Sequence, residues 1–574
     1  MSEADVAAGI DGAAEPPDNL ARYLERKKSC PLIALGHSDG RYYFLTPQGE
    51  LRGAEARDMT ERGLGSLAGG DAGWFIKQFP RFGPSGLAGF EATKSALWLM
   101  RECARAGLWD ANTPVRGPGV WRAGAGVSDG LLVHCGDAVI DRGRERPAGL
   151  VAGGAVYPAR PPIGRPADRA AGAGEAAALI EAVGLWNWRD QAGPDLVTGF
   201  IGASLLGGAA RWRAHLYVLA RFGSGKSWLA ELVGAALGAM AHATSNNFTE
   251  AGLRQALTSQ ARTLLLDEAE GDDSGHRLKA VIELIRHMSG GRGARVMRGT
   301  AGGQAQTFTI TGSAYLSSVL PGILKPQDRS RITLVELAPL HDGPEAAGAA
   351  DRAQAAIAAM AALAPGLWRR AIDGWVRFNE TFEAYRTALM DDGSAAREAD
   401  QLATLLAGRD LLLRDEVPAH DEIRRALARI AGVLAEARDE AADDEGEACL
   451  NHLYSSGSGT LRHGRELTVA EIVMEGRELN SVDARRDMQA LGLRLEGSIG
   501  AWTLLIANRH QGLAHIFRDT RWRDGGHVQA LRYLAGAAAH PRPIKFAGVL
   551  SRAVVLPMRL IASSEDPAEP APGA

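Results

Sequence analysis

Residues 220–227 form an eight-residue run whose composition suits a phosphate-binding loop. The run matches G-x-x-x-x-G-K-[ST], except that alanine stands in place of the first glycine. The two glycines would let backbone N–H groups surround a phosphate at a helix N-terminus, and the lysine would reach the β- and γ-phosphates of ATP. The last serine would place its hydroxyl on Mg²⁺. The predicted nucleotide-binding residues are Ala220, Arg221, Phe222, Gly223, Ser224, Gly225, Lys226 and Ser227.

The segments on either side of this run favour the same interpretation. Residues 216–219 are apolar and strand-like, and residues 228–233 have helical spacing, so the loop joins a strand to a helix. Ala220 is compatible with this position, because a residue leaving a strand with negative φ need not be glycine. A glycine-rich turn without a ligand is the alternative, and the loop alone does not exclude it.

A second motif ends in two carboxylates, Asp267 and Glu268, which follow the apolar run 263–266. This is the Walker B pattern. A buried strand would bring Asp267 to the carboxyl edge of a parallel sheet beside the loop, where it could hold the Mg²⁺ shell while Glu268 polarises water. Such a run on its own is usually a strand leaving the core, but the two motifs together predict a nucleotide-hydrolysing P-loop core.

The stretch that follows is basic, with no acidic residue between Glu283 and Asp328 in a chain of net charge -4. Within it, residues 294–308 read as a hairpin with two strand-like arms around a glycine-containing tip. Arg295 and Arg298 on this hairpin could contact a DNA backbone. The alternative is a surface hairpin that carries arginines incidentally.

Three further side chains are candidates for the reaction itself. The strand predicted over 308–316 is followed by two serines, of which Ser318 could sense the γ-phosphate. Arg329 and Arg331 lie beyond it, and an arginine from one subunit can stabilise transition-state charge on a neighbour's nucleotide. A salt bridge within a loop is the alternative for either arginine.

Bulk composition limits the other function classes. The 574 residues are enough for about three domains, and the slightly acidic charge excludes a generally basic nucleic-acid coat. Four widely separated cysteines predict neither a zinc site nor a disulfide framework, which fits a reducing cytoplasm. No secretory signal or membrane-spanning run is recognisable, so we expect a soluble cytoplasmic protein without a membrane partner.

The order of motifs, composition shifts and periodicities suggests seven segments. A match to the G-x-S-x-G nucleophile elbow at 36–40 is interpreted as a hairpin turn, because a strand rather than a helix follows it. The predicted segments are a disordered start (1–20), an N-terminal α+β domain (21–157), a proline-rich linker (158–175), the ATPase core (176–340), a helical region (341–460), a winged-helix-like domain (461–562) and a disordered tail (563–574).

The C-terminal prediction depends on element order: helices over 468–474 and 481–491, then strands over 493–496 and 502–506. Thr468 and Glu471 form a capping-box pair at the start of the first helix. Arg485 and Arg486 on the second helix are candidate phosphate contacts, or simply part of a solvated helix face.

Taken in order, these motifs resemble the superfamily 3 helicase branch of AAA+ ATPases, in particular the helicase part of phage and plasmid primase-helicases, prophage members included. The resemblance covers roughly residues 200–340. The matching segments are 223–227, 249–257, 265–270, 298–303 and 328–331.

The resemblance implies a multidomain α/β protein with an AAA+ P-loop core, assembled as a homo-oligomeric ring, with a hexamer as the expected form. Single-stranded DNA would be gripped by hairpins lining the pore, with Arg298 facing it, and ATP with Mg²⁺ would sit between subunits. Lys226 and Ser227 would bind nucleotide and metal, Asp267 and Glu268 would handle metal and water, and Ser318 would act as sensor. Arg329 or Arg331 would act in trans.

Three features depart from that family. Ala220 replaces a glycine, the sensor position lacks the common asparagine, and no primase module precedes the core. We therefore expect an ATP-dependent DNA helicase of phage or plasmid-type replication that translocates on single-stranded DNA, with a separate primase or replisome protein as a candidate partner. Two alternatives stay open: an ATP-gated, DNA-binding replication initiator or regulator, and a defence or signalling ATPase.

Overall fold

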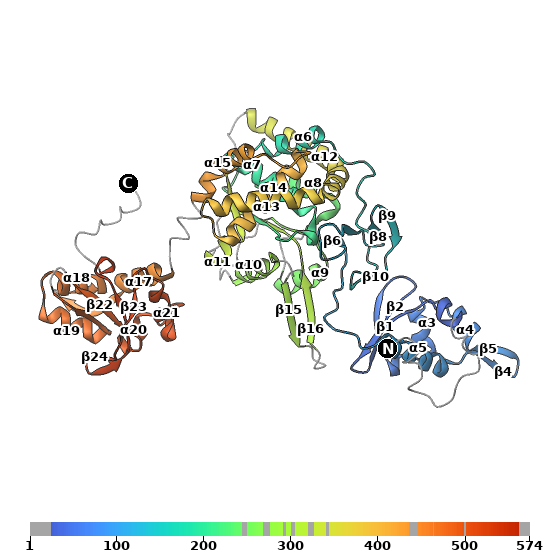
Figure 1. Ribbon diagram of the computed structural model, residues 1–574, viewed down its shortest axis with the longest axis horizontal. Helices are drawn as coiled ribbons and strands as arrows, with labels where there is room; N and C mark the ends of the chain where they lie inside the picture. Colours follow the sequence, from blue (N-terminus) through green and yellow to red (C-terminus); the bar gives the residue numbers. More distant parts are fainter. Residues whose placement is uncertain are drawn as a thin grey trace. The chain divides into compact units, whose positions relative to one another are not determined.

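The computed structural model divides the chain into two compact units, Met1–Leu434 and Ala435–Ala574 (Figure 1). It describes residues 25–243, 249–267, 276–290, 294–299, 305–319, 326–339, 344–435, 445–462, 464–498 and 501–561. The ends predicted to be disordered, 1–20 and 563–574, lie outside these ranges.

Near its start, the first unit has a three-stranded antiparallel sheet whose first turn is the predicted hairpin. Asp39 and Gly40 at that turn have φ of 51° and 77°, so both central residues are left-handed, as in a tight hairpin turn. This confirms a hairpin rather than a nucleophile elbow. The elements are β1 (Ile33–Ser38), β2 (Arg41–Leu45), β3 (Leu51–Glu55), α3 (Glu61–Leu67), α4 (Gly73–Gln78), β4 (Pro80–Gly83), β5 (Gly86–Phe90) and α5 (Ala92–Ala106).

A second small antiparallel sheet follows, in the order β6-β7-β8-β9. Its strands are β6 (Gly119–Arg122), β7 (Leu131–His134), β8 (Ala138–Asp141) and β9 (Arg144–Pro147), with a separate pair β10 (Leu150–Ala152) and β11 (Ala155–Tyr157). Beyond it, the segment predicted as a linker runs without helix or strand from 158 to 172, and Ile163 N donates to Cys135 O at 3.0 Å.

The region predicted to be the ATPase core is built on a five-stranded parallel sheet in the order β13-β14-β17-β12-β18. This confirms the parallel sheet and is consistent with a P-loop core. Its strands are β12 (His215–Ala220), β13 (Ala241–Ala243), β14 (Thr263–Leu266), β17 (Ala314–Ser318) and β18 (Ile332–Leu337). The helices around it include α6 (Ala173–Val183), α7 (Gly193–Ser204), α8 (Lys226–Leu237), α9 (Glu250–Leu257), α10 (His276–Met288) and α11 (Pro326–Arg329).

The core strands are largely apolar because helices cover both faces of the sheet. Along β12, Leu216 and Val218 belong to one hydrophobic core with residues of α7 and α8, whereas Tyr217 and Leu219 belong to another with residues of α9 and α10. Alternate residues of a strand point to opposite faces, so a strand buried on both sides needs an unbroken apolar run.

Between β14 and β17 the chain forms an antiparallel hairpin of β15 (Ala294–Gly299) and β16 (Ala305–Ile310), which extends from the core in Figure 1. Arg298 pairs with Gln306 in its register. The predicted hairpin is confirmed, while its tip, 300–304, lies outside the described residues.

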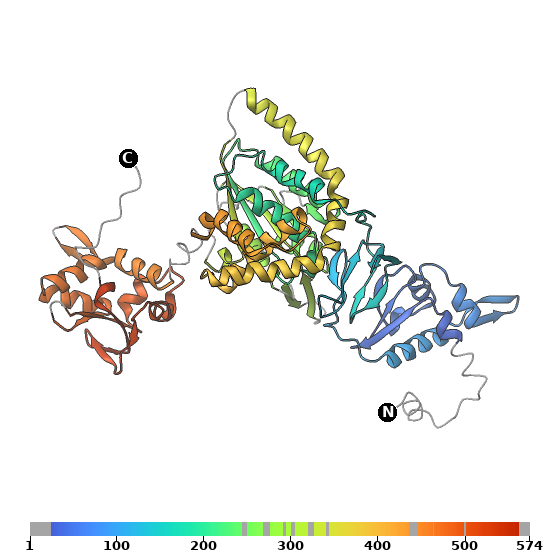
Figure 2. The same cartoon turned by 45° about the horizontal axis from the view of Figure 1, so that its top comes forward.

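After β18 come the helices α12 (Pro344–Asp373), the long yellow helix of Figure 2, α13 (Trp375–Asp391), α14 (Ala396–Leu413) and α15 (His420–Arg429). Helices α14 and α7 cross in direct backbone contact. A Cβ atom at Gly199 would lie 1.9 Å from Leu405 O, and one at Gly202 would lie 2.1 Å from Gly408 O. Only glycine allows this approach.

A buried ionic network reinforces the same crossing. Arg409 of α14 lies 2.7 Å from Asp410 and 3.6 Å from Asp195 of α7. The Tyr385 hydroxyl of α13 donates to Asp410 at 2.7 Å. Helices α7, α13 and α14 are thus joined by buried charged and polar side chains.

The second unit has its own hydrophobic core and a four-stranded sheet in the order β21-β22-β26-β23. Helix α17 contributes to that core, so the compact unit starts before residue 461, where the sequence placed its beginning. The elements are α17 (Glu445–Ser455), β19 (Gly457–Arg462), β20 (Arg465–Thr468), α18 (Val469–Glu478), α19 (Val482–Leu491), β21 (Leu493–Glu496), β22 (Thr503–Ala507), α20 (Gln511–Ile516), α21 (Gly526–Arg532), β23 (Ala538–Ala539), β24 (Ile544–Phe546), β25 (Val549–Ser551) and β26 (Ala553–Leu556).

The two helices and two strands predicted over 468–506 are confirmed by α18, α19, β21 and β22. The capping box between Thr468 and Glu471 is present, with Glu471 N donating to Thr468 Oγ1 at 3.2 Å. In the part of the chain that the structure describes, no helix is both long and apolar enough to cross a membrane.

Candidate functional site

The predicted phosphate loop leaves the end of β12 and enters α8 at Lys226. Gly223 and Gly225 have φ of 79° and 75°, in the left-handed region that favours glycine. Ser224 closes the loop by donating from Oγ to Arg221 O at 2.8 Å. Phe222 at its tip is 95% exposed. The loop therefore has the open, glycine-dependent turn that backbone donors need to surround a phosphate.

The loop is also held from outside. Trp186, which lies between α6 and α7, donates from Nε1 to Gly225 O at 2.9 Å. Because the Gly225 carbonyl is thereby fixed, the peptide that starts α8 is fixed with it, next to Lys226. This contact could not be predicted from the sequence, because residues 186 and 225 come together only when the chain folds.

Lys226 and Asp267 meet at the carboxyl edge of the sheet. The Lys226 Nζ lies 3.9 Å from Asp267 Oδ1, and both side chains are largely buried. Asp267 directly follows β14, and the loop directly follows β12, so parallel strands carry both to the same edge. The structure thus brings together the two residues that the sequence paired. Glu268, the predicted water-polarising residue, lies outside the described residues.

The serine that contacts Asp267 is Ser317 rather than Ser318. Strand β17 lies between β12 and β14, and its Ser317 donates a hydrogen bond to Asp267. Ser318, the predicted sensor, is on the opposite face, where its hydroxyl bonds the Tyr217 hydroxyl at 2.9 Å. The alternation of a strand separates the two serines.

The predicted arginines lie at the opposite edge of the sheet from the loop. Strand β18 begins at Ile332, paired with His215, and ends at Leu337, paired with Ala220. Arg329 and Arg331 precede Ile332, so the length of the strand, about 16 Å, separates their backbone from the loop edge. An arginine in this place cannot reach the phosphates of its own loop.

The surroundings of Arg331 are cationic. Partial burial lowers the pKa of Arg331, and the charges of Arg397 and Arg286 lower it further, whereas Asp328 raises it. Arg286 itself lies 3.4 Å from Asp328. For the hairpin arginines, the structure gives the backbone register of Arg295 and Arg298 but does not describe their side chains.

A cavity of about 580 Å³ lies beside the loop. It is formed where the segment after α6 meets the end of β18: Ala338 N donates to Asn187 O at 2.7 Å, and Asn187 Nδ2 donates to Pro339 O at 3.0 Å. Its lining residues are Trp186, Asn187, Trp188, Gln191, Pro194, Ala338 and Pro339. This aromatic and amide lining suits a planar base, and its volume is that of a small-molecule site.

The donor set fits a magnesium-bound nucleoside triphosphate. Glycine backbone, a helix N-terminus and an ammonium group suit phosphates, while the carboxylate of Asp267 and the hydroxyls of Ser227 and Ser317 are the oxygen ligands that Mg²⁺ takes. Lys226 Nζ, which would contact phosphate, lies 3.9 Å from Asp267 Oδ1, which would face the metal, so the two groups could act on one bound nucleotide.

In the second unit, the two candidate arginines of α19 differ. The Arg485 guanidinium stacks on Trp502, 4.8 Å from the ring centre. Arg486 is 76% exposed and lies 3.1 Å from the equally exposed Asp483. Of the two, Arg486 is the more accessible to a phosphate.

Comparisons with known proteins give limited similarity. No family model matches the chain, and no curated protein matches it by sequence. Among solved structures, that of SCCmec type IV Cch, an active helicase, is 15% identical, covers 92% of this chain and 93% of its own, and has a TM-score of 0.45. The apo A form of the NrS-1 C-terminal region is 10% identical, covers 78% of this chain and 97% of its own, and has a TM-score of 0.29. Scores and identities at this level establish neither a common fold nor a common activity.

Proposed function

We propose that the chain is an ATP-dependent DNA helicase that translocates on single-stranded DNA as a homo-oligomeric ring. The observation that carries this proposal is the meeting of Lys226, Asp267 and Ser317 at one edge of a parallel sheet, with a basic hairpin inserted between two of its strands. The first feature supports nucleotide hydrolysis, and the second supports a use for it on an anionic polymer.

Each residue has a defined task in this proposal. Lys226 neutralises the terminal phosphates, Asp267 holds the metal's water shell, and Ser317 orients the Asp267 carboxylate. Bound Mg²⁺ and ATP supply the phosphoanhydride whose hydrolysis drives movement. Arg295 and Arg298 contact the DNA backbone.

Oligomerisation is part of the proposal because of the sheet geometry. Since Arg329 and Arg331 lie at the far edge of the sheet from their own loop, either can act on a nucleotide only when a second subunit presents its loop there. A ring satisfies this requirement at every interface. A separate primase or replisome protein would act with the ring on replicating DNA.

One observation favours a second candidate, an ATP-gated DNA-binding initiator. The second unit carries two short helices followed by an antiparallel pair, the order of a winged helix, with Arg486 exposed on the second helix. In that case, ATP would control assembly, and this unit would read duplex sequence.

The deciding experiment measures ATP hydrolysis by the full chain with and without oligo(dT), together with unwinding of a forked duplex. A helicase hydrolyses ATP faster with the single strand and separates the fork only when ATP is present. Lys226→Ala should abolish both activities. Hydrolysis without strand stimulation or unwinding, combined with site-specific duplex binding, would favour the initiator instead.

A further inference from the structure

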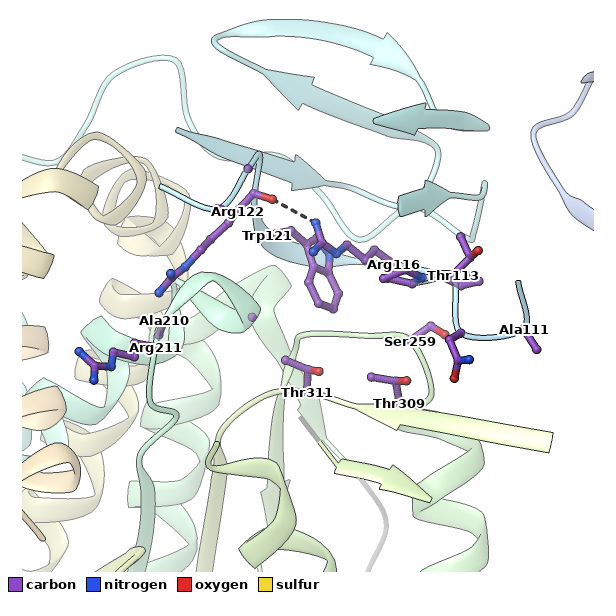
Figure 3. A pocket seen from close by; sticks show the side chains of 16 residues that line it. Ala111, Thr113, Arg116, Trp121, Arg122, Ala210, Arg211, Ser259, Thr309 and Thr311 are labelled. Atoms are coloured by element: carbon purple, nitrogen blue, oxygen red, sulfur yellow. Dashed lines mark hydrogen bonds between the residues drawn. The ribbon is translucent and has the colours of Figure 1, made fainter. Parts of the chain in front are cut away.

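A second cavity, of about 620 Å³, lies at the root of the β15–β16 hairpin (Figure 3). The β6 region forms one side, through Thr113, Arg116 and Arg122, and Arg211 of the core adds a third guanidinium. Ser259, Thr309 and Thr311 supply hydroxyls on the other side. This cavity is separate from the one beside the phosphate loop.

Backbone hydrogen bonds connect the wall of the cavity to the hairpin. Ser259 N donates to Thr309 O of β16 at 2.8 Å, and Gly117 N donates to Ser259 O at 2.6 Å. The approach is close, since a Cβ atom at Gly119 would lie 2.7 Å from Ala261 Cβ. The wall of the cavity is therefore hydrogen-bonded to the strand at the base of the hairpin.

The charged residues that line the cavity are all arginines, while Asp110 and Asp129 lie beside the lining residues Asn112 and Gly124. None of its lining residues is acidic. Arg116 donates from Nη1 to Tyr157 Oη at 2.7 Å and to Arg122 O at 3.0 Å, and Arg122 donates from Nε to Ala209 O at 2.7 Å. These acceptors are neutral, so they hold the guanidinium groups in place without balancing their charge.

The third guanidinium belongs to Arg211, which is 57% exposed and lies 2.8 Å from Glu383. Its charge adds to burial in lowering the pKa of Arg122. The two guanidinium groups therefore repel each other at the wall of the cavity.

A fourth arginine lies behind this wall. Arg213 is 1% exposed and donates from Nε to Met288 O and from Nη1 to Ala210 O, while its Nη2 has no hydrogen-bond partner among the described residues. Burial and the charge of Arg122 lower its pKa to about 10. Buried guanidinium groups without carboxylates are costly, and an anion in the adjoining cavity would offset that cost.

We propose that this cavity binds a nucleotide unit of single-stranded DNA, its phosphate held by Arg116, Arg122 and Arg211 and its sugar and base edges by the hydroxyls of Ser259, Thr309 and Thr311. The inference rests on the proposed function, because it places this contact on the strand that the hairpin engages. The volume admits one or two nucleotides and is too small for a duplex. Arg116 lies over the Trp121 ring at 5.4 Å, so its guanidinium is a fixed planar surface.

The test uses the full chain and fluorescence anisotropy of labelled oligo(dT). The double variant Arg116→Gln, Arg211→Gln should raise Kd by about tenfold or more and flatten the dependence of log Kd on log salt by about one to two charges. The matched control is Arg169→Gln, whose exposed guanidinium pairs with Glu175 at 2.7 Å, and which should bind as the wild type does. Equal Kd values for both variants would overturn the inference and leave the proposed function standing.

Hydrogen exchange on the wild type provides a measurement that does not depend on a variant folding. Oligo(dT) should slow exchange in residues 111–125 and 256–262, and a blunt duplex should not. Protection by dTMP equal to that by oligo(dT) would assign the cavity to a free nucleotide and overturn its assignment to the strand. Strand binding without protection of these segments would likewise overturn the inference, whereas no strand binding at all would overturn the proposed function with it.

Discussion

The hydroxyl of Ser317 donates a hydrogen bond to the carboxylate of Asp267. Strand β17 brings this serine between the strand that carries the phosphate loop and the strand that carries Asp267. Since Lys226 Nζ is 3.9 Å from the same carboxylate oxygen, the hydroxyl and the ammonium group together fix where Asp267 points. A carboxylate held in this way is preorganised for a metal-bound water.

Ser317→Ala should therefore lower kcat for ATP hydrolysis by about tenfold or more while changing KM little, because it loosens Asp267 without touching the loop. Ser318→Ala, which removes the bond to Tyr217, should stay within about twofold. Steady-state kinetics of both variants checks this. The opposite ranking would assign the sensing role to Ser318, as the sequence suggested.

The hydrogen bond from Trp186 Nε1 to Gly225 O predicts an effect on nucleotide binding. Trp186→Phe keeps the apolar ring but loses the donor, and one such bond contributes about 1 kcal/mol, so KM for ATP should rise about fivefold. Trp212→Phe is the control: its Nε1 donates to Gln401 Oε1 at 3.0 Å, and it precedes β12, whose other end carries the loop. Equal KM values for the two variants would show that the Trp186 hydrogen bond does not hold the loop in its nucleotide-binding conformation.

The opposite placement of the loop and the arginines predicts complementation between subunits. Lys226→Ala, Arg329→Ala and Arg331→Ala are each purified and assayed, then mixed in pairs under conditions that exchange subunits. An arginine variant that is inactive alone should recover up to about a quarter of wild-type ATPase activity with Lys226→Ala, because a random mixture restores that share of interfaces. A mixture as inactive as its components, for both arginines, would contradict action in trans.

The buried network around Arg409 predicts a large loss of stability. Asp410→Asn removes the carboxylate that lies 2.7 Å from Arg409 and accepts from Tyr385, so the free energy of unfolding should fall by about 3 kcal/mol. Asp421→Asn, which removes the exposed partner of Arg424, should leave it unchanged. Urea titration monitored by tryptophan fluorescence compares the two, and equal midpoints would contradict the role assigned to the network.

Two buried histidines predict loss of stability in acid. His134 Nδ1 accepts from Gly136 N at 2.9 Å and His215 Nδ1 accepts from Ala314 N at 3.0 Å, so both rings are neutral in the folded chain. Burial, above all, lowers the pKa of His134 to about 4 and that of His215 to about 3. The unfolded chain, with a histidine pKa of about 6.5, takes up protons first as pH falls.

Their contribution is therefore complete above about pH 6.5 and is lost as pH falls toward the folded values. At pH 5 each histidine should lower the free energy of unfolding by about 2 kcal/mol relative to pH 8. In His134→Gln, the change in the free energy of unfolding between pH 8 and pH 5 should be smaller than in the wild type by about 2 kcal/mol. The exposed control His420→Gln should not alter this change. A difference that is the same in both variants would contradict a neutral buried His134.

The sequence predicts the relative position of two residues best where chain order alone decides it. Lys226 and Asp267 each follow an apolar strand, and parallel strands end at one edge, so their proximity follows from the sequence. Which serine contacts Asp267 does not follow from the sequence. Successive residues of a strand point to opposite faces of the sheet, but the sequence does not show which face lies next to the loop. Likewise, nothing in the sequence joins Trp186 to Gly225, or Gly117 to Ser259, since these contacts depend on how distant segments pack.

The direct backbone contact between Gly199 and Leu405 sets a lower limit on how far the chain can be shortened. A fragment ending near residue 340, where the sequence placed the end of the ATPase core, would strip α14 from α7 and open a glycine-lined groove to water. Such a groove invites aggregation rather than folding. The smallest autonomous fragment that carries the parallel sheet therefore has to extend to about Leu434.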